Sequence, residues 1–434
     1  MILFCPVALL ILTGIFFNDH FFWCHWLGFA GLWFLYQKIR ENFFKGFLIP
    51  CWLVFFVVYA AYLYWLLKYK FWVYFIGTLT LSLIFPLFFL VYHLIAPKIR
   101  SALLSVAVVF GLFSLFEFVL SRVSLTGTTP LDLFFHAPIE LLRILHLIDF
   151  KIWCAWIIAA CFVVGELIYG RSRKMLAGFC ALLVVTGILI SFANRYLPRQ
   201  ERRHSMKIAL VQHNLPFSEE WRMDHPSEVK NKYEALALEA AKQRPDLIIF
   251  PQYTFPEDIY RNPEFFAELA KKTGASILTG AHVPVEAGKS ILDYGFMNLA
   301  LLFTPEGKLG GVYQAMTAAP FGEIRQQSAK GYRVIETSFG KLGVLLCYED
   351  VTSRAAQEAV EAGADILVSL SNPGMFSDTL MPYYHLRQDQ LRVMETGLPL
   401  ARVSPNGYSA FIDRTGSIVR TTRLNTEDIL YIDY

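Results

Sequence analysis

Residues 341–350, KLGVLLCYED, place a cysteine at the end of a short apolar run. A run of four to eight apolar residues that ends in polar ones is typical of a buried strand. The loops that follow such strands converge over a rigid scaffold, and they carry a large share of binding and catalytic residues. A lone cysteine at a strand end is inert more often than catalytic, so the residues around Cys347 decide how it is interpreted.

Similar runs alternate with helical segments through the second half of the chain. The strand candidates are KIALVQH (207–213), DLIIFPQ (246–252), ASILTGAHV (275–283), NLALLFT (298–304) and ADILVSLS (364–371), and the helix candidates are 228–243, 263–272 and 353–363. This alternation predicts a layered α/β domain in which helices cover a mixed sheet. Gln252 and Asn372 lie at strand ends, as Cys347 does.

The two halves of the chain differ in charge. Up to residue 192 there are 13 Lys and Arg against 7 Asp and Glu, a net charge of +6, and the remainder carries 26 against 29, a net charge of −3. Neither half has a basic stripe of the kind that binds nucleic acid, so no nucleic-acid partner is expected. The second half has the mixed surface of an ordinary soluble domain.

Cysteine usage argues against disulfides and metal in the second half. Six of the seven cysteines lie in or beside apolar runs: Cys5, Cys24, Cys51, Cys154, Cys161 and Cys180. Cys347 is the single thiol after residue 193, and no CxxC or Cys/His spacing indicates zinc. We expect no metal and no cofactor.

The first half has the composition of a membrane protein. Runs of sixteen or more largely apolar residues can span a bilayer as helices. There are seven, at about 2–17, 21–36, 47–67, 71–95, 103–120, 152–169 and 176–192. The first run could instead be a signal peptide, but it lacks a basic start and a small-residue cleavage site. We therefore predict a helical membrane domain over 1–193, a linker over 194–205 and the α/β domain over 206–434.

Two features of the first half have open interpretations. Glu117 lies inside an apolar run, where an acid is either functional or part of an ion pair, with Arg122 as its nearest candidate. Residues 131–147 have apolar residues at helical spacing but include Pro138, Glu140 and Arg143, so this segment is expected to lie along the membrane interface.

Basic residues in the loops predict the orientation. Clusters follow the second, fourth and sixth runs: Lys38, Arg40 and Lys45, then Lys98 and Arg100, then Arg171, Arg173 and Lys174. The positive-inside rule makes that face cytoplasmic. Seven crossings then deliver the α/β domain to the opposite side, which is the periplasm if the protein lies in the inner membrane of a Gram-negative bacterium. The basic stretch 195–203 argues against this, with less force because a large domain follows it.

Several motifs resemble the nitrilase, or carbon-nitrogen hydrolase, superfamily. KLGVLLCYED resembles its nucleophile strand, FPQYTFPED (250–258) the segment of its general base, VYQAMTAAPFGE (312–323) its lysine segment, and residues 368–413 its late strands and helix. Seven preceding membrane helices narrow the resemblance to the apolipoprotein N-acyltransferases. It implies an αββα fold, a phospholipid acyl donor, a lipoprotein amine as acceptor, and a monomer in the membrane.

The same resemblance assigns catalytic positions, and two of them hold unexpected residues. Cys347 matches the nucleophile, Gln252 stands where a glutamate base is expected, and Ala315 stands where an oxyanion-stabilising lysine is expected. An amide cannot accept the thiol proton, and alanine offers neither charge nor reach. The loss of one member of a buried charged pair costs about 3 to 5 kcal/mol, because the other charge is left uncompensated. The loss of both members avoids this cost, so the two replacements are consistent with each other. Turnover by the family mechanism is not expected.

Other matched positions carry further predictions. Glu323 in the PFGE motif could act as a surrogate base or orienting group for Cys347, or could hydrogen-bond its own loop. The resemblance assigns substrate contacts to Tyr348, Glu349, Asn372, Phe376, His385 and Trp221. Departures from the family pattern at Thr317, Pro373 and Met375, a short 323–331 segment, and no apolar run after Tyr431 indicate an altered site.

Three hypotheses remain at this point. The chain is an acyltransferase with a rearranged site, or it is an inactive family member that binds lipid or lipoprotein or assists an active paralogue. In the third, Gln252 and Ala315 are deliberate replacements that trap a complex.

Overall fold

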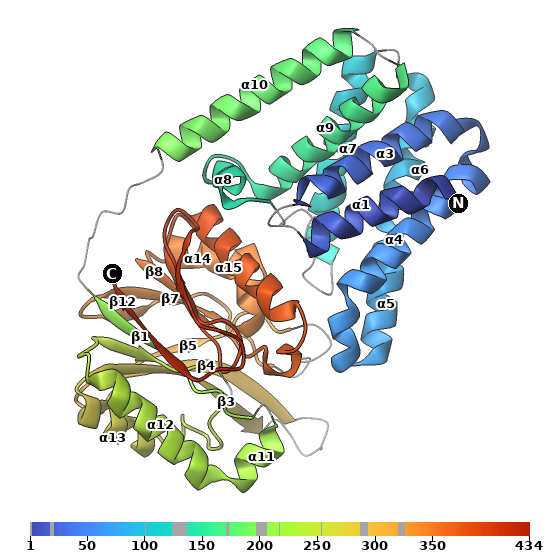
Figure 1. Cartoon of the computed structure of the whole chain (residues 1–434). Coiled ribbons are helices and arrows are strands. Elements are labelled where there is room, and N and C mark those ends of the chain that lie inside the picture. The colour runs from blue at the N-terminus through green and yellow to red at the C-terminus, as the bar shows by residue number, and fades with distance from the viewer. Residues whose placement is uncertain are drawn as a thin grey trace. The chain divides into compact units, whose positions relative to one another are not determined.

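The computed structural model divides the chain into two compact units, Met1–Leu197 and Pro198–Tyr434, drawn in Figure 1. The structure describes residues 2–17, 21–99, 101–123, 137–170, 173–196, 206–216, 218–252, 254–286, 294–319 and 326–434.

The first unit is built of apolar helices. They are α1 (Cys5–Phe16), α3 (Trp23–Ile39), α4 (Ile49–Tyr62), α5 (Phe71–Ser82), α6 (Ile84–Ile95), α7 (Ala102–Val123), the short α8 (Ile139–Leu142), α9 (Phe150–Gly170) and α10 (Arg173–Tyr196). Among the described residues, four segments are long and apolar enough to cross a membrane: Trp23–Tyr62, Phe71–Lys98, Phe150–Gly170 and Leu176–Arg195. The shorter apolar helices are Ile2–Phe16 and Leu104–Leu120. The chain is a multi-pass membrane protein, as predicted.

The segment Trp23–Tyr62 folds back on itself. Phe29 and Phe55 are 26 residues apart, which would separate them by about 39 Å in one straight helix. Their ring centroids are 5.8 Å apart, and those of Tyr36 and Phe47 are 5.4 Å apart. The chain therefore reverses between α3 and α4, through a 3₁₀ turn and a π-helical turn over residues 40–48. Each of the seven predicted apolar runs is largely helical in the described residues.

Helices α3 and α9 run parallel and in close contact. Trp33 packs on Phe162 with ring centroids 4.7 Å apart, and four residues further along each helix Gln37 donates a hydrogen bond to Glu166. A Cβ atom on Gly165 would lie 2.6 Å from the Cβ of Trp33. Glycine is thus what allows the two backbones to approach, as is common between membrane helices.

Two predicted features of this unit are only partly described. Glu117 is fully buried within α7, whereas the side chain of Arg122 lies outside the described residues. Of the segment predicted to lie along the interface, the structure describes α8 and a 3₁₀ turn over Arg143–His146. The orientation of that segment in a membrane stays a prediction.

The second unit contains two six-stranded sheets. The strands are β1 (Lys207–Gln212), β2 (Leu247–Ile249), β3 (Ser276–Glu286), β4 (Tyr294–Phe303), β5 (Leu309–Gln314), β6 (Ile335–Thr337), β7 (Gly340–Leu346), β8 (Ile366–Leu370), β9 (Leu400–Val403), β10 (Ala410–Ile412), β11 (Ile418–Thr421) and β12 (Asp428–Asp433). One sheet has the order β12-β1-β2-β3-β4-β5 and the other β11-β10-β9-β8-β7-β6. In both sheets parallel pairs at the centre are flanked by antiparallel pairs.

Strand alternation separates the layers of this unit. Along β1, Ile208 and Leu210 join the apolar layer between the sheets, where they meet residues of β7 and β8 such as Val344 and Val368. The intervening Ala209 and Val211 join the layer beneath the helices. The helices are α11 (Glu219–Asp224), α12 (Pro226–Ala241), α13 (Glu264–Thr273), α14 (Ser353–Glu361) and α15 (Met381–Thr396). With α12 and α13 outside one sheet and α14 and α15 outside the other (Figure 1), the predicted αββα fold is confirmed.

Candidate functional site

Cys347 lies at a sharp turn directly after β7, which pairs in parallel with β8. It opens a 3₁₀ turn over Cys347–Asp350, its backbone φ is +51°, and its side chain is half-buried. A positive φ is uncommon for a residue with a Cβ atom, and such a conformation costs on the order of 1–3 kcal/mol. The surrounding structure must hold this turn in place, and two buried carboxylates within it make the contacts that do so.

The first of these carboxylates is Glu349, whose oxygens accept hydrogen bonds from several groups. The backbone N–H groups of Leu346 (2.9 Å), Met316 (2.7 Å) and Thr317 (3.3 Å) donate to it, as does the Tyr313 hydroxyl (2.9 Å). Burial raises its pKa to about 7, although these donors act in the opposite direction. Glu349 therefore fastens the cysteine turn to the segment after β5, and the chain itself occupies the oxygens assigned to substrate by resemblance.

The positions of the expected base and lysine meet through one asparagine on β4. Gln252 is fully buried and its Nε2 donates to Asn298 Oδ1 at 2.6 Å, while the backbone N–H of Ala315 donates to the Asn298 carbonyl at 2.9 Å. Asn372, which follows β8, donates to the Gln252 carbonyl at 3.2 Å. Strand β8 pairs with β7, so the contact from Asn372 places Gln252 near the end of β7, which carries Cys347. The hydrogen bond from the N–H of Met316 to Glu349 places Ala315 there as well.

These two positions are electrically neutral. Ala315 is fully buried. The Oε1 atom of Gln252 and the Nδ2 atom of Asn298 are buried and have no hydrogen-bond partner among the described residues. Neither position offers a base that could take the thiol proton or a cation that could stabilise an oxyanion.

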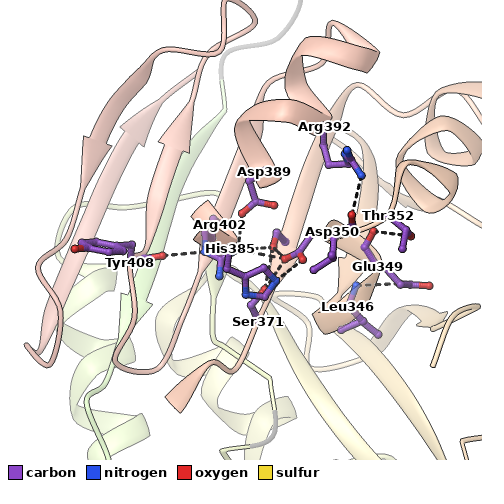
Figure 2. Close-up of polar contacts among 12 residues, drawn as sticks. Leu346, Glu349, Asp350, Thr352, Ser371, His385, Asp389, Arg392, Arg402 and Tyr408 are labelled. Atoms are coloured by element: carbon purple, nitrogen blue, oxygen red, sulfur yellow. Dashed lines mark hydrogen bonds and ion pairs between the residues drawn. The ribbon is translucent and has the colours of Figure 1, made fainter. Parts of the chain in front are cut away.

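The second carboxylate, Asp350, organises a buried polar network (Figure 2). Its Oδ2 accepts hydrogen bonds from the hydroxyls of Ser369 and Ser371, both at 2.7 Å, and from Arg402 at 3.2 Å. Its Oδ1 pairs with Nε2 of His385 on α15. The network ties the cysteine turn to β8, β9 and α15.

Asp389 completes this network from α15. Arg402 is fully buried and contacts Asp389 at 2.5 Å as well as Asp350, and its Nε donates to the Tyr408 carbonyl at 3.1 Å. Burial would raise the pKa of Asp350, but His385 and Arg402 outweigh it and hold that pKa at about 2. For Asp389, burial dominates and raises the pKa to about 7, with Arg402 opposing. Asp350 is thus the ionised partner of Arg402.

The pKa of His385 is lowered within the same network. Burial is the largest cause and Arg402 adds to it, whereas Asp350 and the backbone of Cys347 act in the opposite direction. The neutral imidazole is therefore the resting form. His385 was predicted from sequence as a substrate contact, and the structure places it against the cysteine turn.

The remaining predicted residues stay predictions. Glu323 lies outside the described residues. Tyr348 belongs to the cysteine turn and Phe376 to a 3₁₀ turn over Gly374–Phe376. Trp221 lies on α11 and stacks on His225, with ring centroids 4.6 Å apart. In the described part of the chain no group of three or more His, Cys, Asp or Glu residues could hold a metal ion.

Sequence reasoning missed Asp350 and Asp389. Asp350 follows the CYE motif directly, yet an acid at the start of a loop is usually solvated. Asp389 lies among polar residues of α15, a pattern that predicts an exposed helix face. Arg402, which pairs with both carboxylates, lies on β9, so no local pattern links it to either acid.

Comparisons with known proteins agree with this fold. A model of the carbon-nitrogen hydrolase family matches residues 207–434, more than half of the chain, so the chain belongs to the carbon-nitrogen hydrolase family. An apolipoprotein N-acyltransferase of Geobacter metallireducens is 25% identical over 271 residues, which cover 57% of this chain and 51% of that protein. One of Haemophilus influenzae is 24% identical over 321 residues, covering 68% and 60%. The predicted resemblance is confirmed.

The matched lengths are partial. The chain covers about half of the Geobacter protein and 60% of the Haemophilus protein. A carbon-nitrogen hydrolase from Helicobacter pylori G27 aligns with a TM-score of 0.42 and 18% identity, covering 53% of this chain and 89% of that one. A member of branch 10 of the nitrilase superfamily from Saccharomyces cerevisiae aligns with a TM-score of 0.42 and 20% identity, covering 53% and 90%.

Proposed function

We propose that this chain is a membrane protein of the apolipoprotein N-acyltransferase type whose Cys347 accepts an acyl chain from phospholipid and passes it slowly to a lipoprotein amine. The observation that carries the proposal is the turn at Cys347. Two buried carboxylates hold Cys347 in a strained backbone conformation at the end of β7. The neighbouring positions of the expected base and lysine, Gln252 and Ala315, are neutral.

The neutral positions set the expected rate. A cysteine without a base is only a few per cent thiolate at pH 7. The loss of one oxyanion donor typically slows catalysis about 10²- to 10³-fold. Groups that act as a unit do not contribute additively, so the two losses need not multiply. Slow acylation of Cys347, rather than rapid turnover, follows from this chemistry.

The helix pairing supports a periplasmic location for the α/β unit. Helices α3 and α9 run parallel, so their carboxyl ends lie on the same membrane face, and a basic cluster follows each of them. Helices α9 and α10 form a hairpin, in which Trp156 Nε1 donates to Thr186 Oγ1 at 2.9 Å. Helix α10 therefore leads the chain to the opposite face, which the positive-inside rule makes periplasmic in a bacterial inner membrane.

Impermeant maleimide on cells with a permeabilised outer membrane tests this orientation. The variant Lys242→Cys places a thiol on an exposed site of the α/β unit, and Lys45→Cys places one within the first basic cluster. With the labelled peptide identified by mass spectrometry, so that the native Cys347 does not interfere, we expect labelling at position 242 and protection at position 45 until the cells are lysed. The reverse pattern would place the α/β unit in the cytoplasm.

The substrates are proposed from the names of the relatives, and the protein is proposed to act as a monomer. Intact-mass analysis of the full chain, incubated with phospholipid vesicles in detergent, tests acyl uptake. We expect an adduct of one acyl chain that disappears in Cys347→Ala. If no adduct forms over hours, the acyl-transfer proposal is wrong.

The second candidate is an inactive family member that binds lipid or lipoprotein, or assists an active paralogue. The hydrogen bond between Gln252 and Asn298 favours it, because an amide fixed to a second amide stabilises the pocket without adding basicity. The double variant Gln252→Glu and Ala315→Lys separates the two. A gain in acylation of 100-fold or more from a measurable baseline supports slow transfer. Acylation only in the double variant supports the inactive member.

A further inference from the structure

Helices α4 and α5 of the membrane unit form a hairpin. Trp52 Nε1 donates a hydrogen bond to Ser82 Oγ at 3.1 Å, and the Tyr74 hydroxyl donates to the Ala60 carbonyl at 3.2 Å. The members of the first pair lie 15 residues before and after Leu67, and those of the second pair lie 7 residues before and after it. Two pairs centred on the same residue mean that the helices are antiparallel and that the chain turns around Leu67.

The connection between the two helices, residues 64–72, is named here the α4–α5 tip. It consists of a 3₁₀ turn over its first five residues and the start of α5. Its surface combines two cations with large apolar side chains. Lys68 and Lys70 are exposed, and Phe71 and Trp72, which follow directly, are 69% and 46% exposed.

The positive charge of the tip is not offset by acids of its own helices. From residue 42 to residue 116 the sequence contains no Asp and no Glu, so α4, α5 and α6 carry no carboxylate side chain. Lys68 and Lys70 therefore give the α4–α5 tip a local charge of +2. The nearest acids along the sequence, Glu41 and Glu117, belong to other segments of the unit.

The tip lies at the membrane face opposite to the first basic cluster. Helix α4 runs antiparallel to α3, because Phe29 packs on Phe55 and Tyr36 packs on Phe47. The first basic cluster belongs to the turn between these two helices, so the far end of α4 lies at the other face. In the proposed orientation that face is the outer one, toward the periplasm.

We propose that the α4–α5 tip binds the headgroups of anionic phospholipids in the leaflet it enters. Tryptophan side chains favour the level of the headgroups, which sets the depth of Trp72. Lysine stems lie along apolar surface and extend their ammonium groups toward the polar region, where phosphate oxygens are suitable partners. A zwitterionic headgroup carries its own cation, so Lys68 and Lys70 favour lipids with a net negative charge. This surface would act whether or not Cys347 takes up an acyl chain.

The surface that continues from the tip identifies lipid, rather than a soluble protein, as its occupant. Along α5 the exposed side chains are Phe75 and Ile76, at 49% and 45% exposure, and Leu79 on the next turn. These residues belong to a segment that is long and apolar enough to cross a membrane. The tip is thus the polar end of a surface that faces acyl chains.

Native mass spectrometry of the full chain in detergent tests the proposal. The protein carries Cys347→Ala, so that only non-covalent lipid is counted. It is titrated with phosphatidylglycerol, which is anionic, and with phosphatidylcholine, which is zwitterionic. We expect phosphatidylglycerol to bind more tightly. In the variant Lys68→Gln with Lys70→Gln its affinity should fall at least about fivefold, which is the attraction of roughly one basic residue to an anionic surface. The affinity for phosphatidylcholine should not change.

The matched control removes the same charge from the α/β unit. Lys242→Gln with Lys271→Gln replaces two exposed lysines there and should bind phosphatidylglycerol as the parent protein does. Equal thermal midpoints in detergent show that the variants are folded. If the tip variant keeps its affinity for phosphatidylglycerol, or loses affinity for both lipids equally, the proposal is wrong. A parent protein that does not distinguish the two lipids overturns it as well.

Discussion

Replacing Arg402 by methionine should destabilise the α/β unit far more than removing an exposed arginine. Arg402 is fully buried between Asp350 and Asp389, which are fully buried too. Methionine has a similar length and no charge. Removal of one partner of a buried ion pair costs about 3–5 kcal/mol, because the remaining charge is left uncompensated. Since whole domains are stable by about 5–15 kcal/mol, this is a large share of the total.

Hydrogen exchange of the full chain in detergent, followed by mass spectrometry of peptides from β8 and β9, measures the effect in the right unit. The protected amides of these strands should lose about 3–5 kcal/mol of opening free energy in Arg402→Met. The matched control is Arg354→Met on α14, whose side chain is 70% exposed and pairs with Glu358 in the next turn. An exposed pair of this kind contributes about 0–1 kcal/mol.

The double variant Arg402→Met with Asp389→Leu isolates the electrostatic cause. It removes the Asp389 carboxyl group together with the arginine that contacts it, so this carboxyl group is not left buried without its partner. The double variant should therefore be more stable than the sum of the two single losses predicts. Asp350 would still have His385, Ser369 and Ser371. Equal losses in Arg402→Met and Arg354→Met, or strict additivity in the double variant, would refute the reasoning.

Three further changes have defined outcomes. In the folded wild type Glu349 keeps its proton between pH 4.5 and about 7, so the unfolding free energy should fall by about 3 kcal/mol as the pH rises through that window. The variant Glu349→Gln has no proton to lose there. Denaturant titrations at pH 5 and pH 8 should therefore show a smaller loss in the variant than in the wild type. Gly280→Ala would place a Cβ 2.7 Å from the Cα of Gln252 and should cost about 1–3 kcal/mol by the same titration. Gly165→Ala would place a Cβ 2.6 Å from that of Trp33 and should lower the thermal midpoint of the membrane unit in detergent, because α3 and α9 must separate.

Controls for the two glycine changes come from open positions. A Cβ on Gly331 or on Gly178 would meet no atom within 4 Å. Gly331→Ala and Gly178→Ala should therefore leave stability nearly unchanged. If Gly280→Ala and Gly165→Ala behave like these controls, the close approaches seen at Gln252 and Trp33 are not tight packing.

Most of the fold could be predicted because its signals are local. The strand and helix candidates in the second half correspond to β1–β4, β7, β8, α12, α13 and α14. The apolar runs of the first half are long enough to be identified as helices from the sequence of each run alone. Pairings between distant segments could not be predicted in this way. Strand β12 lies beside β1, and the N–H of Met206 donates to the carbonyl of Tyr434. These two residues lie at opposite ends of the sequence of the α/β unit.

The candidate site was predictable only where a motif carried it. The position of Cys347 after an apolar strand is a local signal, and the structure bears out its place at the strand end. Helix α15 gives the opposite result. Nothing in its polar pattern indicates burial, yet His385, Asp389 and Arg392 are buried. Burial of these residues depends on Asp350 and Arg402, which lie on other elements, and no local pattern contains that information.

The two groups of polar residues around Cys347 differ in what their charges do. At Gln252 and Ala315, where charge would act on the reacting atoms, the side chains are neutral. At Asp350 and Arg402, where charge holds the turn, it is present and buried. Buried ion pairs of this kind are often no more stabilising than apolar residues of the same size. A chain that needed only the αββα fold would gain little from them, whereas a chain that must hold a cysteine at φ +51° gains a fixed turn. The network is therefore better explained by the fixed turn at Cys347 than by the stability of the domain.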